Sequence, residues 1–103
     1  MPLSPTQNSL KLLRQDYDLV QVVEHWNSFT RTRKDLWCFD IIACKKDEIC
    51  LVQTTSYSNL NARLKKITES GFLPSLREAG FRLLLHGWRK QKNRWTYKEI
   101  DVS

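Results

Sequence analysis

The sequence predicts an α+β fold, in which a mixed β-sheet is flanked by helices. Segments rich in β-branched and aromatic residues alternate with segments whose apolar residues recur every three or four positions. The chain has 103 residues, so we expect residues 1–103 to form a single domain with one core. Hydrophobic residues make up 41% and charged residues 27% of the chain, which excludes a disordered or low-complexity protein.

The first segments predict a helix, a strand and a loop. Ser4 and Pro5 form a helix start, with serine as the N-cap and proline in the first turn. An apolar stripe that includes Leu13 follows at helical spacing. Residues 19–26 are β-branched and aromatic, which predicts a strand, and the polar residues 30–35 predict a loop.

The next segments predict a hairpin at the centre of the sheet. Residues 36–44 are almost continuously apolar, which predicts a strand buried on both faces, with Trp37 in the core. Residues 45–48 are polar and predict a short connection. Residues 49–55 predict a second strand, which is apolar until its end.

The second half of the chain predicts two helices and two strands. A helix capped at Ser58 has an apolar face, and Gly71 ends it. Pro74 starts a shorter helix. The last elements are a strand over residues 81–88, a polar turn over 89–93 and an edge strand over 94–102. The order is therefore αβββαβ with an extra C-terminal strand.

The net charge is +6, and it is unevenly distributed along the chain. Residues 1–52 carry 7 basic and 7 acidic groups, so the whole excess lies in residues 53–103. A basic patch of this kind favours a polyanionic partner such as DNA, and the alternative is a solvated face that only aids solubility. The cations expected to contact nucleic acid are Arg31, Arg33, Lys34, Arg63, Arg89, Lys90, Lys92 and Arg94.

Several function classes lack their sequence signature. No run of 18 apolar residues exists, so no membrane partner is expected, and the N-terminus has no apolar signal core, which predicts a cytoplasmic protein. No glycine-rich phosphate loop exists, so no nucleotide cofactor is expected. The two histidines occur without a nucleophile elbow, so we expect His86 to be a packed, hydrogen-bonded residue and not a catalytic base.

Asp40 is the one acid in the apolar segment 36–44. An ionised carboxylate in apolar surroundings is costly unless it is paired, hydrogen-bonded or bound to a metal. If residues 45–48 form a hairpin, Asp40 and Gln53 come together on neighbouring strands. Oxygen ligands of this kind suit Mg²⁺ or Mn²⁺, with water as the remaining ligands. The alternative is a structural ion pair, for example with Arg63.

An αβββαβ order with Asp40 followed by Gln53-x-Thr55 resembles the PD-(D/E)xK nuclease superfamily, especially the small archaeal Holliday-junction resolvases and VRR-type nucleases. The chain is also similar to a group of small phage and bacterial proteins in the segments Phe39-Asp40-Ile41-Ile42-Ala43 and Leu51-Val52-Gln53-Thr54-Thr55. The resemblance implies a restriction-endonuclease-like core, cleavage of phosphodiester bonds in DNA, branched DNA included, and a homodimer.

The resemblance also implies roles for individual residues. Asp40 is the main metal ligand, Gln53 stands where the second acid belongs, and the backbone carbonyl of Thr54 is a further ligand. Thr55 stands at the lysine position, where a hydroxyl cannot supply the positive charge. Lys66 on the following helix is the expected substitute for that lysine, unless it is only solvated or bound to phosphate. Glu24 is expected to complete the catalytic metal site, unless it simply faces solvent.

The sequence therefore predicts a metal-dependent endonuclease that acts on DNA. Two alternatives stay open at this point. The replacement Gln53-x-Thr55 fits a catalytically inactive relative that binds DNA. The same fold also fits a protein-interaction module, for example an inhibitor encoded by a phage.

Overall fold

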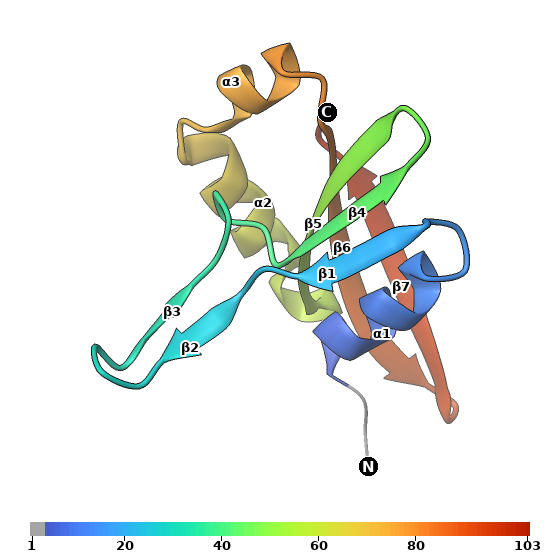
Figure 1. Ribbon diagram of the computed structural model, residues 1–103. Coiled ribbons are helices and arrows are strands. Elements are labelled where there is room, and N and C mark those ends of the chain that lie inside the picture. The colour runs from blue at the N-terminus through green and yellow to red at the C-terminus, as the bar shows by residue number, and fades with distance from the viewer. Residues whose placement is uncertain (1–3) are drawn as a thin grey trace.

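The structure is a computed structural model that describes residues 4–103, apart from the side chains of residues 25–27, 32 and 33. It is an α+β fold with a five-stranded mixed sheet flanked by helices, as the sequence predicted (Figure 1). The elements are α1 (Pro5–Leu13), β1 (Leu19–Val22), β2 (His25–Asn27), β3 (Thr32–Lys34), β4 (Ile41–Lys45), β5 (Glu48–Ser56), the 3₁₀ turn η1 (Tyr57–Asn59), α2 (Leu60–Glu69), α3 (Leu73–Glu78), β6 (Arg82–Gln91) and β7 (Arg94–Asp101).

The five-stranded sheet has the order β1-β4-β5-β6-β7. The predicted hairpin is confirmed, since β4 and β5 pair antiparallel and close at Lys45 and Glu48. Strands β5 and β6 are parallel, and the chain crosses between them through α2 and α3. Strand β7 pairs only with β6 and forms the predicted edge.

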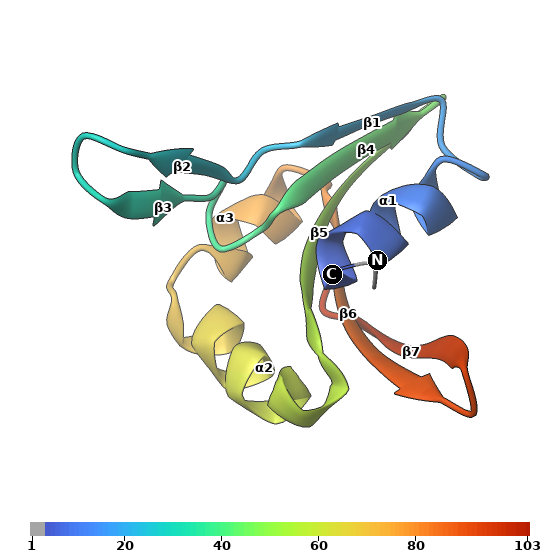
Figure 2. The same ribbon diagram turned by 90° about the horizontal axis from the view of Figure 1, so that it is seen from below.

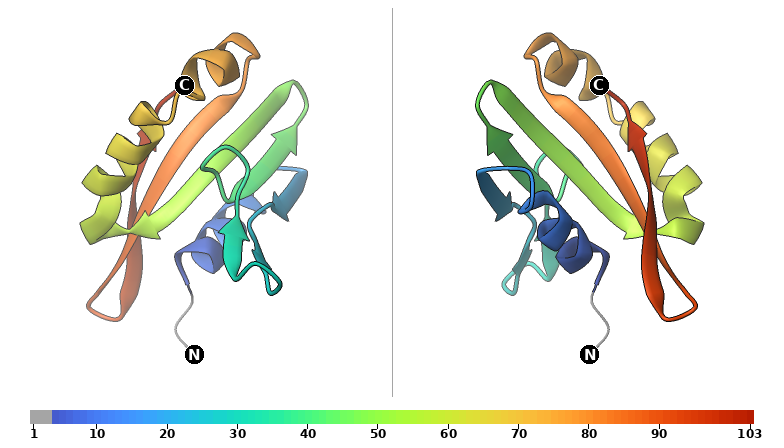
Figure 3. Two further views of the ribbon diagram at one scale, coloured as in Figure 1. Left: turned by 90° about the vertical axis from the view of Figure 1, so that its left-hand side faces the viewer. Right: turned by 90° about the vertical axis from the view of Figure 1, so that its right-hand side faces the viewer.

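Helices cover both faces of the sheet, with α1 on one side and α2 and α3 on the other (Figures 2 and 3). Alternation along β5 divides its side chains between two cores. Leu51 packs with residues of α2 and α3, whereas Cys50 and Val52 pack with Leu13 of α1. The chain thus stabilises its sheet from both sides, and each fully buried aliphatic side chain contributes roughly 1.5–3 kcal/mol. None of the helices in residues 4–103 is long and apolar enough to cross a membrane.

The start of α1 is fixed by the predicted N-cap. The Ser4 Oγ atom accepts a hydrogen bond from the Gln7 backbone N–H at 3.2 Å, and the Ser4 N–H donates to Gln7 Oε1 at 3.2 Å. These reciprocal bonds satisfy two backbone donors that would otherwise lack partners, and Pro5 occupies the first turn. The same helix then places Thr6 and Ser9 on the sheet.

The prediction of one strand over residues 19–26 is wrong. Strand β1 ends at Val22, because the backbone N–H groups of Val23 and Glu24 both donate to the Asp40 carbonyl, at 2.8 and 3.4 Å. The chain leaves the main sheet at this point. Strand β2 pairs instead with β3, so residues 30–35, predicted as a loop, include a strand of a separate hairpin.

The prediction of one strand over residues 36–44 is also wrong. Strand β4 begins at Ile41, and a tight turn precedes it, in which Leu36 and Phe39 exchange backbone hydrogen bonds of 3.0 and 2.8 Å. Trp37 and Cys38 adopt left-handed backbone conformations in this turn, with φ of 50° and 74°. Trp37 is therefore 41% exposed, and its predicted place in the core is wrong.

Helix α2 begins later than predicted. A 3₁₀ turn precedes it, and the N-cap is Asn59 instead of Ser58. The predicted apolar face is confirmed by Leu60 and Ile67, which are buried. A Cβ atom at position 87 would lie 2.3 Å from Leu60 Cγ, so the glycine there leaves the space into which Leu60 packs. This close approach fixes the start of α2 against β6.

The second half otherwise follows the prediction, except at the β6–β7 turn. Strand β6 continues to Gln91, so the predicted turn over residues 89–93 is confined to Lys92 and Asn93. These two residues have φ of 47° and 64°, as a two-residue hairpin turn requires. Arg89 and Lys90 therefore lie on a strand and not in a loop.

Candidate functional site

A cavity of about 650 Å³ opens at the C-terminal end of β5. The first turn of α1, one face of α2 and the two residues that flank the β2–β3 hairpin, Glu24 and Asp35, also line it. The structure brings together there every catalytic and metal-binding residue that the sequence predicted, together with one of the predicted cations. These are Glu24, Asp40, Gln53, Thr54, Thr55, Lys66 and Arg63.

Asp40 lies at the floor of this cavity and is only 5% exposed. Its Oδ2 atom accepts three hydrogen bonds, from Gln53 Nε2 at 3.0 Å, from the Thr54 backbone N–H at 2.9 Å and from Thr54 Oγ1 at 3.1 Å. The expected approach of Asp40 and Gln53 across the hairpin is therefore observed. Strand β5 supplies all three donors because Ile41, the first residue of β4, pairs with Val52, so that Asp40 lies beside the next residues of β5.

Burial raises the pKa of Asp40 to about 6, although the backbone hydrogen bond from Thr54 acts in the opposite direction. The charge of Glu24 and a hydrogen bond between the two side chains raise this pKa further. Two carboxyl groups thus share one site, where both are charged only at a considerable cost. A proton or a bound cation relieves this repulsion.

Gln53 carries an unsatisfied polar atom in the same place. Its side chain is 4% exposed, and its Nε2 atom donates to Asp40 Oδ2 and to the Thr54 carbonyl, the latter at 3.3 Å. Its Oε1 atom is buried and has no hydrogen-bond partner among the described residues. A buried acceptor without a donor is costly, and it indicates a place where a cation or a ligand donor belongs.

The donor set suits a hard divalent cation such as Mg²⁺ or Mn²⁺ better than a softer metal such as Zn²⁺, which prefers His and Cys ligands. No cluster of three or more His, Cys, Asp or Glu side chains in the described part of the chain is arranged to hold a metal ion. Mg²⁺ needs only one or two carboxylates, because it keeps several waters and takes phosphate oxygens as further ligands. Glu24, Asp40 and the Oε1 atom of Gln53 supply such a set. The Thr54 carbonyl, which was also a predicted ligand, accepts a hydrogen bond from Gln53.

Helix α2 adds positive charge to the opposite wall. Arg63 and Lys66 lie three residues apart, so both project from the same side of the helix into the lining of the cavity. Neither makes an ion pair with a described side chain. The cavity therefore combines the buried Asp40 carboxylate with cations that are available to an anionic ligand.

Sequence reasoning did not find the contribution of α1. The Thr6 and Thr54 hydroxyls lie 2.9 Å apart, so Thr6 extends the hydrogen-bond network of Asp40 to the first turn of this helix. Ser4 lines the cavity as well. The N-cap signal in the sequence located the helix start, but no local pattern places that start beside β5.

The other predicted cations lie on two hairpins and not in the cavity. Arg89, Lys90, Lys92 and Arg94 are exposed on the β6–β7 hairpin, and Arg31 and Lys34 are exposed on the β2–β3 hairpin. The Arg33 side chain is outside the described part of the chain. Arg89 stacks over the ring of Tyr57 at 4.3 Å, which connects this hairpin to η1. Both hairpin tips lie toward the end of the molecule where α1 begins (Figures 1 and 3).

His86 is buried and hydrogen-bonded, as predicted. Its Nδ1 atom lies 2.8 Å from Ser9 Oγ and its Nε2 atom 2.9 Å from Glu99 Oε2, while Trp88 Nε1 donates to Ser9 Oγ at 2.8 Å. Because Trp88 can only donate, the Ser9 hydroxyl donates to Nδ1, and Nε2–H donates to Glu99. Ser9 is fully buried, so no substrate reaches its hydroxyl. This series of hydrogen-bonded side chains is therefore structural.

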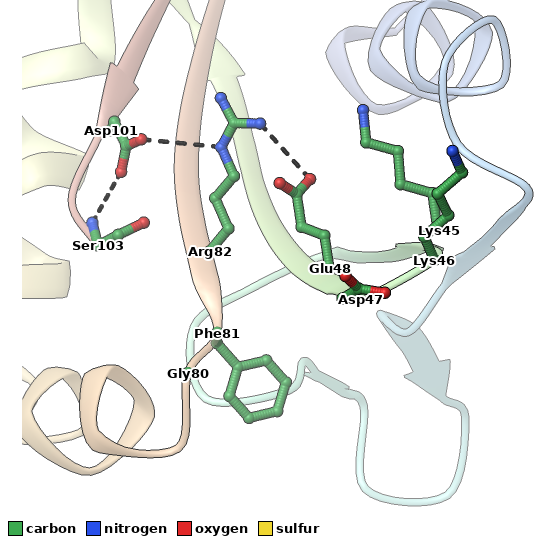
Figure 4. A pocket seen from close by; sticks show the side chains of 9 residues that line it. All are labelled: Lys45, Lys46, Asp47, Glu48, Gly80, Phe81, Arg82, Asp101 and Ser103. Carbon is green, nitrogen blue, oxygen red and sulfur yellow. Dashed lines mark hydrogen bonds and ion pairs between the residues drawn. The ribbon is translucent and has the colours of Figure 1, made fainter.

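A second cavity, of about 570 Å³, lies at the other end of β5 (Figure 4). Two of its acids are already paired, since Arg82 lies 3.5 Å from Glu48 and 3.8 Å from Asp101. Hydrogen bonds from Ser103 lower the pKa of Asp101. A set of acids with its own cations and donors has no need of a ligand, so this cavity is the weaker candidate.

The candidate site therefore lies where β5, α1 and α2 meet, and it combines the buried Asp40 carboxylate, a buried acceptor of Gln53 without a partner among the described residues, and two cations without an ion pair to a described side chain. No protein-family model, no curated protein and no solved structure matches this chain.

Proposed function

We propose that this protein is a Mg²⁺- or Mn²⁺-dependent endonuclease that cleaves phosphodiester bonds in DNA. The observation that carries the proposal is the buried Asp40 carboxylate beside Glu24 and Gln53, opposite the cations of α2, where Gln53 Oε1 lacks a partner within the described part of the chain. The strand order β1-β4-β5-β6-β7 with helices on both faces is compatible with a restriction-endonuclease-like core. In this proposal the β2–β3 hairpin is an addition to that core.

The chemistry follows from the two walls of the cavity. In phosphodiester hydrolysis a water oxygen bonds to phosphorus, the bond to the leaving oxygen breaks, and the water proton is passed on to that oxygen. A divalent cation held by Glu24, Asp40 and Gln53 Oε1 would supply an acidified water and charge neutralisation. Lys66 and Arg63 pair with oxygens of the scissile phosphate, and the Lys66 ammonium provides the positive charge that Thr55 lacks.

DNA is the partner that the charge distribution favours. The net charge is +6, and the exposed cations of the β6–β7 and β2–β3 hairpins flank the end of the molecule that holds the cavity. Cations at such positions contact phosphates and orient the duplex without reading its sequence. The resemblance to small nucleases further suggests a homodimer, which would present two such sites to one DNA molecule.

A second function is favoured by one contact. Gln53 Nε2 donates to Asp40 Oδ2 and so already compensates part of the carboxylate charge that a cation would neutralise. An amide in this role fits a catalytically inactive relative that binds DNA through its hairpins. The two functions differ in one measurable property, which is metal-dependent cleavage.

A nicking assay on supercoiled plasmid with Mg²⁺ or Mn²⁺ tests the proposal. We expect the wild type to nick, and Asp40→Ala and the isosteric Asp40→Asn to lose at least about a hundredfold in rate. Lys66→Ala should lose about as much, whereas Lys65→Ala, its exposed neighbour outside the cavity, should cleave normally. Cleavage retained in Asp40→Asn would refute the site. Salt-sensitive DNA binding without nicking in either metal would establish the inactive alternative.

A further inference from the structure

The tip of the β2–β3 hairpin exposes one aromatic ring to an unusual degree. Phe29 is 98% exposed, whereas Tyr97, the next most exposed of the aromatic side chains that the structure describes, is 44% exposed. Asn27 and Thr32 are the last paired residues, so Phe29 lies in the four-residue loop 28–31. Burying this ring against another apolar surface therefore gains more than burying any of those other rings.

The hairpin is joined directly to the candidate site. Strand β2 begins one residue after Glu24 and β3 ends one residue before Asp35, and both of these acids line the cavity. The hairpin projects away from the five-stranded sheet, beyond the helices (Figures 1 and 2). At about 3.3 Å per residue, the three residues of β2 and two loop residues place Phe29 at most roughly 16 Å from Glu24, which is within about five base-pair steps along a duplex.

The surroundings of Phe29 suit nucleic acid. Its neighbours Ser28 and Thr30 are polar and exposed, and Arg31 and Lys34 place exposed cations on the same hairpin. Cations beside an exposed ring are the combination with which proteins stack on a base and hold the adjacent phosphates. An apolar ring at the end of a projecting loop is also the shape that enters between unstacked base steps.

We propose that Phe29 stacks on an unstacked base within about five steps of the scissile phosphate, so that the site acts on DNA whose stacking is already interrupted. Opening an intact step is costly, whereas a bulge, a mismatch or a branch point offers a free base face. Phe29 therefore selects interrupted duplexes over fully paired ones. This inference rests on the proposed action on DNA, but it assigns the substrate preference to a residue outside the catalytic cavity.

Binding measured without cleavage separates this inference from the nuclease proposal. The full chain with Asp40→Asn is titrated, without divalent metal, against a fluorescent duplex with a two-nucleotide bulge and against a paired duplex of the same length. Into this background we introduce Phe29→Ala, Phe29→Trp and, as a control, Phe72→Ala, which removes an exposed ring beside α3.

Phe29→Ala should weaken binding to the bulged duplex about tenfold and binding to the paired duplex less than twofold. Phe29→Trp should restore the preference, and Phe72→Ala should leave both affinities unchanged. Three results would overturn the inference. Phe29→Ala could bind the bulged duplex as tightly as its parent does, it could lose the same affinity for both duplexes, or the parent could bind neither duplex. This binding test needs no cleavage. If the wild type fails to nick DNA but the Phe29 effect on binding is observed, only the nuclease proposal is refuted.

Discussion

Two buried polar clusters lie side by side under α1, and they differ in how well their hydrogen bonds are satisfied. Thr54 of β5 pairs with His86 of β6 in the sheet, and the two contact Thr6 and Ser9, one helical turn apart. Around His86, both ring nitrogens, the Ser9 hydroxyl and the Trp88 N–H all have hydrogen-bond partners. Around Asp40, two acids share a site, and the Gln53 Oε1 atom accepts no hydrogen bond from any residue that the structure describes.

This difference separates a structural cluster from a candidate functional one. A satisfied network stabilises the fold, and burial lowers the pKa of His86 so that it stays neutral. An unsatisfied network costs stability, and the surrounding fold has to compensate for it. Removing a group should therefore have opposite effects on stability in the two clusters.

The largest expected effect is a gain in stability at Asp40. Its folded pKa of about 6 lies above the ordinary value of 3.8, so the folded state holds this proton more tightly than the unfolded state does. Stability is therefore lost as the pH rises from about 4 to above 6, by on the order of 3 kcal/mol. Asp40→Asn should remove this loss. The free energy of unfolding of this variant should exceed that of the wild type by about 2–3 kcal/mol at pH 7.5 in EDTA and by much less at pH 4.

Urea unfolding at both pH values measures this effect. Taking the difference between variant and wild type cancels the titration of other groups, among them His86. A variant that is less stable than the wild type at pH 7.5 would show that the Asp40 carboxylate is a satisfied structural group, which would remove the contrast between the clusters.

A loss of stability is expected at Ser9. Ser9→Ala leaves the Trp88 N–H and His86 Nδ1 buried without partners, which should cost about 2 kcal/mol even after the better helix propensity of alanine. Thermal or urea unfolding measures the loss. Ser75→Ala, an exposed serine of α3, is the matched control and should change stability by less than about 0.5 kcal/mol. An equal change in stability for both variants would mean that the hydrogen bonds between Ser9, His86 and Trp88 contribute nothing to stability.

The smallest effect is expected at Arg82, whose network is more open to solvent. Arg82 contacts Glu48 and Asp101 at 3.5 and 3.8 Å, but its side chain is 38% exposed. Arg82→Met should therefore cost only about 1 kcal/mol, and less in high salt, because solvent already screens these charges. Unfolding at low and high ionic strength measures both values. A loss of stability as large as that of Ser9→Ala would show that the contribution of these networks to stability does not depend on their exposure to solvent.

The centre of the site was accessible from sequence, because it depends on local pairing. A polar tetrapeptide between two apolar strands predicts a hairpin, and the hairpin register alone brings Asp40 to Gln53. The spacing of Arg63 and Lys66 on a helix was equally readable. The contribution of Thr6 was not, because it depends on where α1 packs.

The errors arose where the chain turns without a turn residue. Residues 19–26 contain no breaker, yet Val23 and Glu24 leave the sheet by sharing the Asp40 carbonyl. Trp37 and Cys38 occupy a turn position that glycine or asparagine usually takes. Such turns are determined by tertiary contacts, so local propensity predicts strand instead.

Calorimetric titration of Mn²⁺ into the metal-free protein at pH 7.5 tests most directly whether the unsatisfied cluster is a cation site. We predict saturable binding to the wild type, loss of that binding in Asp40→Asn, and unchanged binding in Glu48→Gln, an acid of β5 that Tyr17 and Arg82 already satisfy. Binding that is equal in wild type and Asp40→Asn, or no binding to the wild type at millimolar Mn²⁺, would contradict the account.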